Sequence, residues 1–219
     1  MKKTTKKKTK AKSTVKSVKV VAPSGSKKSA TVAKGKSIKL AVTVNATKKA
    51  YKKVTYKVSN KKVISVSKKG VVKGKKAGTA TVKVISAKNK KKTASIKIKV
   101  VSGAVKKVKL NKSNLALNVG DSGKLSVKVT ASKKAYKTLK WTTSNKKVAT
   151  VTSKGVVKGI GKGTAKITAA SLDGTGKKST CTVTVREKQV VNGIKSLEVY
   201  NPLKSYSSST LKVTLDSPQ

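Results

Sequence analysis

The sequence predicts an all-β protein made of two tandem β-sandwiches, and two observations support that fold class. Apolar residues alternate with Lys and Thr along short runs, a period-2 pattern that is typical of strands with one buried face. The stretch 54–82 also returns as 139–167, with fifteen of 29 positions identical. Because an offset of 85 residues is the length of a small domain rather than of a solenoid repeat, we expect two copies of one domain.

The alternating runs place the expected strands at matching positions in the two copies. The clearest runs are 37–44, 80–84 and 95–100 in the first copy, and 124–129, 165–169 and 181–185 in the second. Gly, Asn and Ser separate these runs at short intervals, as turns do in a sandwich or barrel. No helix is predicted.

The repeat and the composition divide the chain into four parts. These are a basic flexible arm at 1–14, a first domain at 15–101, a second domain at 105–185 and a C-terminal extension at 188–219. Because the linker at 102–104 is short, we expect the two domains to lie end to end with little relative motion.

The C-terminal extension contains two strand-like runs, 193–201 and 210–215. They are either the beginning of a truncated third copy or extra strands that pair with the second domain or with a neighbouring molecule. In the latter case the unpaired strands would favour self-association through strand addition.

The charge of the chain is strongly one-sided. It has 56 basic residues against 5 acidic ones, a net charge of +51, and residues 1–120 contain no acid. Such a charge predicts a polyanionic partner. Arg186 is the only arginine, and the lysine ammonium is a hydrated point charge without the planar fork of arginine. The composition therefore favours diffuse attraction to phosphates or carboxylates over base-by-base readout of nucleic acid.

Catalysis is not predicted, and neither is a cofactor. The chain has no His, its few acids are isolated in sequence, and no Ser, Thr or Cys has an evident base other than Lys. Asp121 and Asp173 are interpreted as turn residues, because calcium needs several oxygen ligands and little competing positive charge. We therefore expect no enzyme activity and no metal site.

Four residues are singled out by comparing the copies. Cys181 aligns with Ile96, which predicts a buried core position for both. Trp141 aligns with Tyr56, which predicts core packing, with carbohydrate stacking as the alternative. A stacking platform would need several exposed aromatic side chains, and the chain has only six aromatic residues.

The candidate contacts for an anionic polymer are runs of lysines and two tyrosines. Tyr51 and Tyr136 share the motif Lys-Lys-Ala-Tyr-Lys between strands and are the candidate exposed aromatic contacts. The candidate lysines are Lys6, Lys7, Lys8, Lys48, Lys49, Lys52, Lys53, Lys90, Lys91 and Lys92.

Several motifs, in order and at matching spacing, resemble the bacterial Ig-like domain, group 2. They are the stretches 108–121, 141–159, 163–169 and 181–185. The first copy departs from this pattern, with Tyr56 in place of the tryptophan and Lys36 in place of Asp121. The resemblance implies a small Greek-key β-sandwich. It also implies a spacer or adhesive module of surface proteins and secreted enzymes, or an appendage of phage virions, rather than a particular reaction.

Three functions remain as hypotheses. The first is a non-catalytic structural or adhesive module that attaches to anionic polymers of the cell envelope, such as teichoic acid or an acidic glycan. The second is a virion structural or decoration protein docked on an acidic capsid surface. The third is nonspecific nucleic-acid binding, against which the scarcity of Arg and aromatic residues counts.

The location follows from the same alternatives. The basic N-terminus leads into no apolar segment of the kind found in signal peptides, and no apolar run approaches the ~18 residues that span a bilayer. We therefore expect no membrane insertion. The protein is extracellular or on the cell surface if an export signal has been removed, and otherwise part of a virion.

Overall fold

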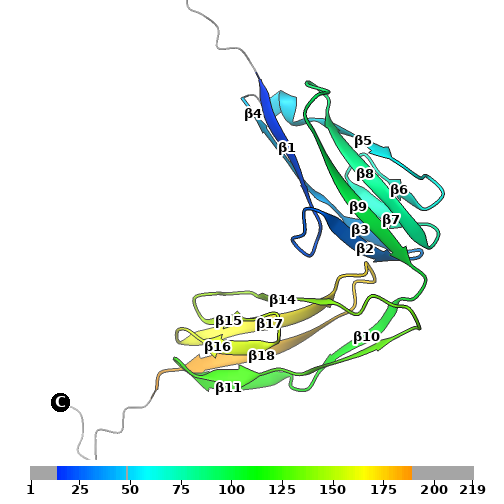
Figure 1. The fold of residues 1–219 in the computed structure, drawn as a ribbon. Coiled ribbons are helices and arrows are strands. Elements are labelled where there is room, and N and C mark those ends of the chain that lie inside the picture. The colour runs from blue at the N-terminus through cyan, green and yellow to red at the C-terminus, as the bar shows by residue number, and fades with distance from the viewer. Residues whose placement is uncertain (1–13, 48, 189–219) are drawn as a thin grey trace, which may run out of the picture.

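The computed structural model describes residues 14–47 and 49–188, and within them the chain forms two all-β sandwiches, as predicted (Figure 1). The one helical element of these ranges is a short 3-10 helix, η1 (Lys49–Lys52), which connects two strands. Of the basic arm only Thr14 is described. The strands predicted at 193–201 and 210–215 lie outside the described residues.

Domain 1 contains nine strands in two layers. Its strands are β1 (Val15–Val21), β2 (Ser29–Ala33), β3 (Ser37–Lys39), β4 (Ala41–Ala46), β5 (Val54–Val58), β6 (Ile64–Val66), β7 (Val71–Gly74), β8 (Gly78–Ser86) and β9 (Thr93–Val101). One layer is the sheet β2-β9-β8-β5, and the other holds β1-β4 and β3-β7-β6 (Figure 1). The chain changes layer between β1 and β2, because β1 pairs with β4 whereas β2 pairs in parallel with β9.

Domain 2 repeats this topology strand for strand. Its strands are β10 (Val105–Leu110), β11 (Asn114–Asn118), β12 (Ser122–Lys124), β13 (Val127–Ala131), β14 (Leu139–Thr143), β15 (Ala149–Val151), β16 (Val156–Gly159), β17 (Gly163–Ser171) and β18 (Lys178–Arg186). The sheet β11-β18-β17-β14 corresponds to β2-β9-β8-β5, and the pairs β10-β13 and β12-β16-β15 form the other layer.

Branched aliphatic side chains fill both cores. Val82 and Ile98 in domain 1, like Ile167 and Val183 in domain 2, are completely buried. These side chains occupy alternate positions of long strands, whereas Lys, Thr and Ser occupy the positions between them. The alternation seen in the sequence is therefore the alternation between core and solvent.

Cys181 is a core residue, as its alignment with Ile96 predicts. Both side chains are at most 1% exposed. Burial raises the pKa of the Cys181 thiol, and the positive charge of Lys112 only partly opposes that shift. A buried, protonated thiol acts as a small apolar side chain.

Trp141 and Tyr56 pack against the cores of their domains, each over a glycine. Gly155 and Gly70 have φ angles of +78° and +75°, a backbone region that favours glycine. A Cβ atom at Gly155 would lie 2.9 Å from the Trp141 ring, and one at Gly70 would lie 2.7 Å from Tyr56 Oη. Both aromatic side chains are half-buried. Both residues pack against the core as predicted, and each also lines an open cleft of about 490 Å³ on its own domain. Burial raises the pKa of Tyr56.

Candidate functional site

Five of the predicted lysine contacts lie together at the end of domain 1 that faces away from domain 2. Lys52 is the last residue of η1 and Lys53 follows it, and residues 90–92 belong to the turn between β8 and β9; all five side chains are exposed. The two segments are adjacent, because the Ala87 amide donates a hydrogen bond to the Lys53 carbonyl oxygen at 3.0 Å. Lys6, Lys7, Lys8 and Lys48 lie outside the described residues, and only the backbone of Lys49 is described.

The two predicted tyrosine contacts lie in different environments. Tyr51 is half-buried against the core of domain 1, and Lys88 Nζ lies 5.0 Å from the centre of its ring. This is the geometry of a cation–π contact. Tyr136, also half-buried, lines a cleft of about 560 Å³ between the domains, together with Lys99 and Lys134. Of the two predicted tyrosine contacts, Tyr136 is therefore the one that lines the cleft between the domains.

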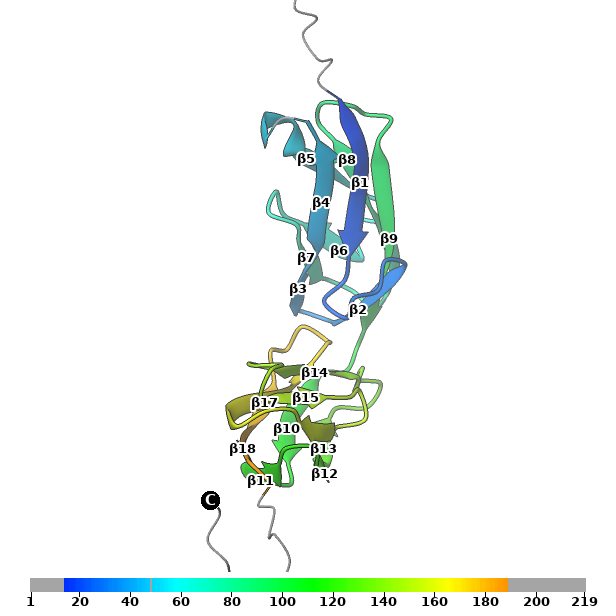
Figure 2. The same cartoon turned by 90° about the vertical axis from the view of Figure 1, so that its left-hand side faces the viewer.

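The two domains meet end to end (Figure 2). The Ala33 amide of domain 1 donates a hydrogen bond to the Asp173 carbonyl oxygen at 2.8 Å, and Lys140 Nζ donates one to the Pro23 carbonyl oxygen at 2.9 Å. The turn between β17 and β18 approaches domain 1 so closely that a Cβ atom at Gly174 would lie 2.6 Å from the Ser37 carbonyl oxygen. These contacts restrain the joint.

Asp173 connects this turn to the linker. Its side chain is completely buried, and its carboxylate accepts hydrogen bonds from the Val105 amide at 2.7 Å and from the Thr175 amide at 3.0 Å. The hydroxyls of Ser171 and Thr175 donate to the same carboxylate. Val105 begins β10 directly after the linker, so one side chain holds the turn and the start of domain 2 together.

Hydrogen bonding decides the protonation state of Asp173. Burial alone would raise its pKa, but the hydrogen bonds from Ser171, Thr175 and Val105 outweigh burial and hold the pKa below its ordinary value. Asp121, by contrast, is exposed and accepts a hydrogen bond from Asn118 Nδ2 at 3.0 Å within its own turn. Both acids have the predicted turn role, and Asp173 has an interdomain role that the sequence did not indicate.

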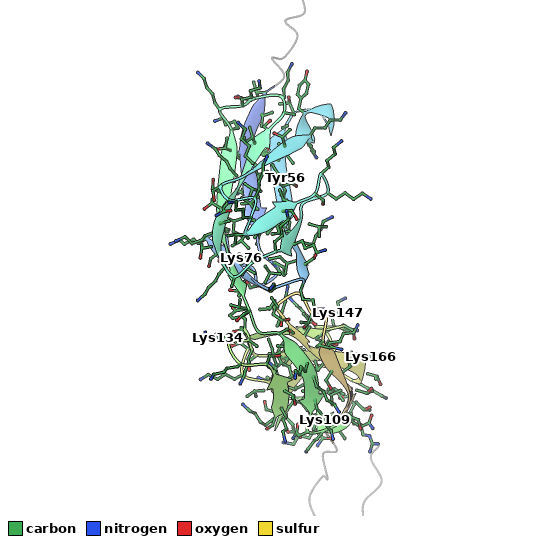
Figure 3. The ribbon with its side chains drawn as sticks, turned by 90° about the vertical axis from the view of Figure 1, so that its right-hand side faces the viewer. Tyr56, Lys76, Lys109, Lys134, Lys147 and Lys166 are labelled. Atoms are coloured by element: carbon green, nitrogen blue, oxygen red, sulfur yellow. The ribbon has the colours of Figure 1, made fainter. Side chains whose placement is uncertain are left out.

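Four exposed lysines that the sequence analysis did not single out lie on the outward face of the sheet β2-β9-β8-β5. We call this group the lysine face; it consists of Lys57 on β5, Lys83 on β8, and Lys97 and Lys99 on β9. Lysine side chains project into solvent from both domains (Figure 3). The lysine face differs from the predicted lysine runs because a sheet, rather than the local sequence, brings its members together.

The matching face of domain 2 carries threonines at these four positions and has exposed lysines at others, Lys140 on β14 and Lys166 on β17. The 85-residue offset places Thr142, Thr168, Thr182 and Thr184 at the four positions. There the hydroxyls of Thr168 and Thr180 lie 3.3 Å apart across the β17–β18 pair. Comparing the two copies position by position would have found the lysine face from the sequence, because these four Lys-to-Thr differences all fall on the outward positions of one sheet.

Residues 14–47 and 49–188 contain no group of three or more His, Cys, Asp or Glu side chains that could hold a metal ion. In the same ranges no helix is long and apolar enough to cross a membrane.

The repeated two-layer sandwich, with the strand that changes layer, is the Ig-like class of fold. The chain belongs to the bacterial Ig-like domain (group 2) family, which it matches twice, at residues 14–96 and 104–183. The resemblance stated from the sequence motifs is thereby confirmed for both copies. The fold of this family is of a non-catalytic kind. The function of this chain must therefore be argued from the surfaces of its two domains.

Two similar proteins are much longer than this chain. A 3-O-alpha-D-galactosyl-alpha-L-arabinofuranosidase of Bifidobacterium longum subsp. longum is 43% identical over 72 residues, which are 33% of this chain and 6% of the relative. An uncharacterised protein of Clostridium acetobutylicum is 29% identical over 166 residues, which are 76% of this chain and 16% of the relative. The chain thus spans a small fraction of the length of these relatives.

The solved structures that are similar to the chain share little sequence with it. The S-layer protein rSbsC(31-844) has a TM-score of 0.36 and 20% identity, and the match covers 81% of this chain and 28% of that one. An intimin mutant of EHEC O157:H7 has a TM-score of 0.28 and 16% identity, over 47% of this chain and 51% of that one. We draw no functional conclusion from these two similarities.

Proposed function

We propose that this chain is a non-catalytic Ig-like module that attaches to anionic polymers of the bacterial cell envelope through its lysines. The observation that carries the proposal is the absence of counter-charge: domain 1, residues 15–101, contains 26 lysines and no acid. Ordinary protein surfaces mix both signs. A surface with one sign attracts a polyanion by releasing its counterions, which requires no built pocket.

The folded domains support this proposal because their lysines are exposed and do not contribute to the cores that stabilise the fold. Each core is filled by apolar side chains, and the lysines stand at outward positions of strands or in turns. The second domain keeps the same fold with 18 lysines and two acids in residues 105–185. The lysine content of domain 1 therefore exceeds what the fold requires.

The proposal is tested by binding of the purified chain to bacterial cell-wall sacculi, with and without their teichoic acids, at ~0.15 M salt. At that ionic strength exposed charges are screened beyond about 8 Å, so only close multiple contacts persist. We expect retention on intact sacculi, loss of retention when the teichoic acids are removed, and elution by added salt. No retention on either preparation would contradict the proposal.

A further inference from the structure

The lysine face forms a continuous line of positive charge across domain 1. In the strand register Lys57 lies directly opposite Lys83, and Lys83 lies opposite Ser95, two residues before Lys97. Directly opposed Cβ atoms are about 5 Å apart, and diagonal or alternate positions are about 7 Å apart. The line therefore runs from β5 through β8 to Lys97 and Lys99 on β9.

This arrangement is unfavourable for the free domain. Like charges directly opposite each other on a sheet are destabilising, and domain 1 contains no acid that could compensate Lys57 and Lys83. The threonines at the same positions of domain 2 show that the fold does not require lysines there. A ligand that places negative charge over the line would remove the repulsion.

Hydroxyl groups flank the line and add hydrogen-bond donors. Lys97 is paired with Thr81 on β8 and with Ser29 on β2, and Lys99 is paired with Thr79 and Thr31. All lie on the same outward face because side chains alternate along a strand.

The line leads into the cleft between the domains. Lys99 lines both the sheet face and the cleft, whose other lining side chains include Lys134 and Tyr136 of domain 2. Lys134 has a φ of +60°, the one non-glycine residue with a positive φ among those described. Backbone in this region is uncommon outside glycine and often occurs at ligand sites. The cleft thus places a fifth lysine and an aromatic ring at the end of the line.

We propose, on the basis of the proposed function, that the lysine face and this cleft form the binding track for a phosphodiester-linked wall polymer. A glycerol phosphate chain carries one negative charge per short repeat, which suits closely spaced lysines, whereas acidic glycans separate their carboxylates by whole sugars. Single-stranded nucleic acid also has closely spaced phosphates but binds best where aromatic side chains stack on its bases. The outward positions of the lysine face carry no aromatic residue.

The experiment compares two variants with the same change in charge. The track variant carries Lys57→Thr, Lys83→Thr, Lys97→Thr and Lys99→Thr, which are the residues of domain 2. The control variant carries Lys16→Thr, Lys19→Thr, Lys39→Thr and Lys73→Thr, which remove four exposed lysines from the opposite layer. The probe is fluorescently labelled poly(glycerol phosphate), titrated into the full chain at several salt concentrations.

We expect the track variant to bind at least about tenfold more weakly than the control variant. The magnitude of its negative slope of log Kobs against log salt should decrease by about 3 relative to the unmodified chain, as expected for the loss of four phosphate contacts. Circular dichroism verifies that each variant is folded.

The outcomes separate this inference from the proposed function. If the unmodified chain does not bind the polymer, the proposed function itself fails. If both variants weaken binding equally, attraction is diffuse and the track is overturned, while the proposed function stands. If single-stranded DNA of equal phosphate number binds more tightly than poly(glycerol phosphate), the assignment of the ligand is overturned.

Discussion

The two domains have one fold and two different surfaces. Domain 1 has 26 lysines and no acid, whereas domain 2 has 18 lysines and two acids, yet their strands pair in the same order. Among the described residues, the positions that differ in charge are outward except for that of the buried Asp173, and the positions that fill the core keep their apolar character. The comparison teaches that in this sandwich the surface charge varies independently of the fold.

The domains also differ at the position of Asp173. The 85-residue offset places Lys88 there in domain 1, where its ammonium lies over the ring of Tyr51. The turn of domain 2 holds the joint through a buried carboxylate, whereas the turn of domain 1 carries an exposed lysine. The same turn is thus an interdomain contact in one copy and a charged surface in the other.

The ends of the matching strands β2 and β11 also differ in how their last backbone amide is hydrogen-bonded. In domain 1 the Ala33 amide donates to a carbonyl oxygen of domain 2 at 2.8 Å. The matching residue of domain 2 is Asn118, whose amide and side-chain nitrogen donate to Asp121 at 3.4 and 3.0 Å. In domain 1 this amide is hydrogen-bonded to the neighbouring domain, whereas in domain 2 it is hydrogen-bonded to an acid of its own turn.

The largest expected effect on stability is that of Asp173→Ala. It leaves the buried amides of Val105 and Thr175 without their acceptor, so domain 2 should lose about 3–5 kcal/mol of unfolding free energy. Trp141 is the only tryptophan, so its fluorescence during denaturant unfolding follows domain 2 alone. The exposed Asp121→Ala is the control and should cost about 1 kcal/mol or less. Equal losses in both variants would contradict the role of Asp173 in the joint.

The next largest expected effect on stability is that of alanine at the two glycines that lie under Trp141 and Tyr56, and it should differ between the two domains. At Gly155 the added Cβ would lie 2.5 Å from the Leu125 carbonyl oxygen, whereas at Gly70 the nearest backbone atom is 3.6 Å away and only the tip of Tyr56 is closer. We expect Gly155→Ala to cost about 3 kcal/mol and Gly70→Ala about 1–2 kcal/mol. Calorimetry of each variant measures both. A larger loss for Gly70→Ala would show that the tyrosine cannot shift.

Acid should destabilise domain 2 more than domain 1. The pKa of Asp173 is lower in the folded chain than its ordinary value, so its contribution is present above the unfolded pKa of about 3.9 and is lost as the pH falls below that value. Residues 15–101 contain no carboxylate side chain that could act in this way. The denaturant midpoint of domain 2, followed by Trp141 fluorescence, should therefore decrease as the pH is lowered from about 5 to 2. In the Asp173→Asn variant the midpoint should depend less on pH. An equal decrease in the midpoint of domain 1 would argue against Asp173 as the cause.

The smallest expected effect is that of Cys181→Val. Ile96 occupies the same core position in domain 1, so another apolar side chain should change the unfolding free energy by less than about 1.5 kcal/mol. In the folded chain the Cys181 thiol should react with a disulfide reagent only as fast as domain 2 opens, because it is buried and its pKa is raised. Rapid labelling under native conditions would show that this core position is accessible.

The sequence predicted much of the core because alternation and the repeat are local, readable signals. It placed Cys181 and Trp141 correctly, since a partner copy supplied Ile96 and Tyr56 for comparison. It did not predict the buried role of Asp173, because its partner Val105 is 68 residues away and an isolated acid between glycine and leucine resembles any turn residue. The cleft that Tyr136 lines also depends on two domains at once.

The sequence by itself determined the all-β class, the two domains, their family and the excess of positive charge, because strand periodicity and composition do not depend on distant contacts. Tertiary structure alone decided which lysines share a face. Lys57 and Lys83 become neighbours through antiparallel register, and Lys99 and Lys134 line one cleft only because the domains join there. Charge interaction depends on distance in space, and the distance between these residues is set by strand pairing and by the joint rather than by their order in the chain.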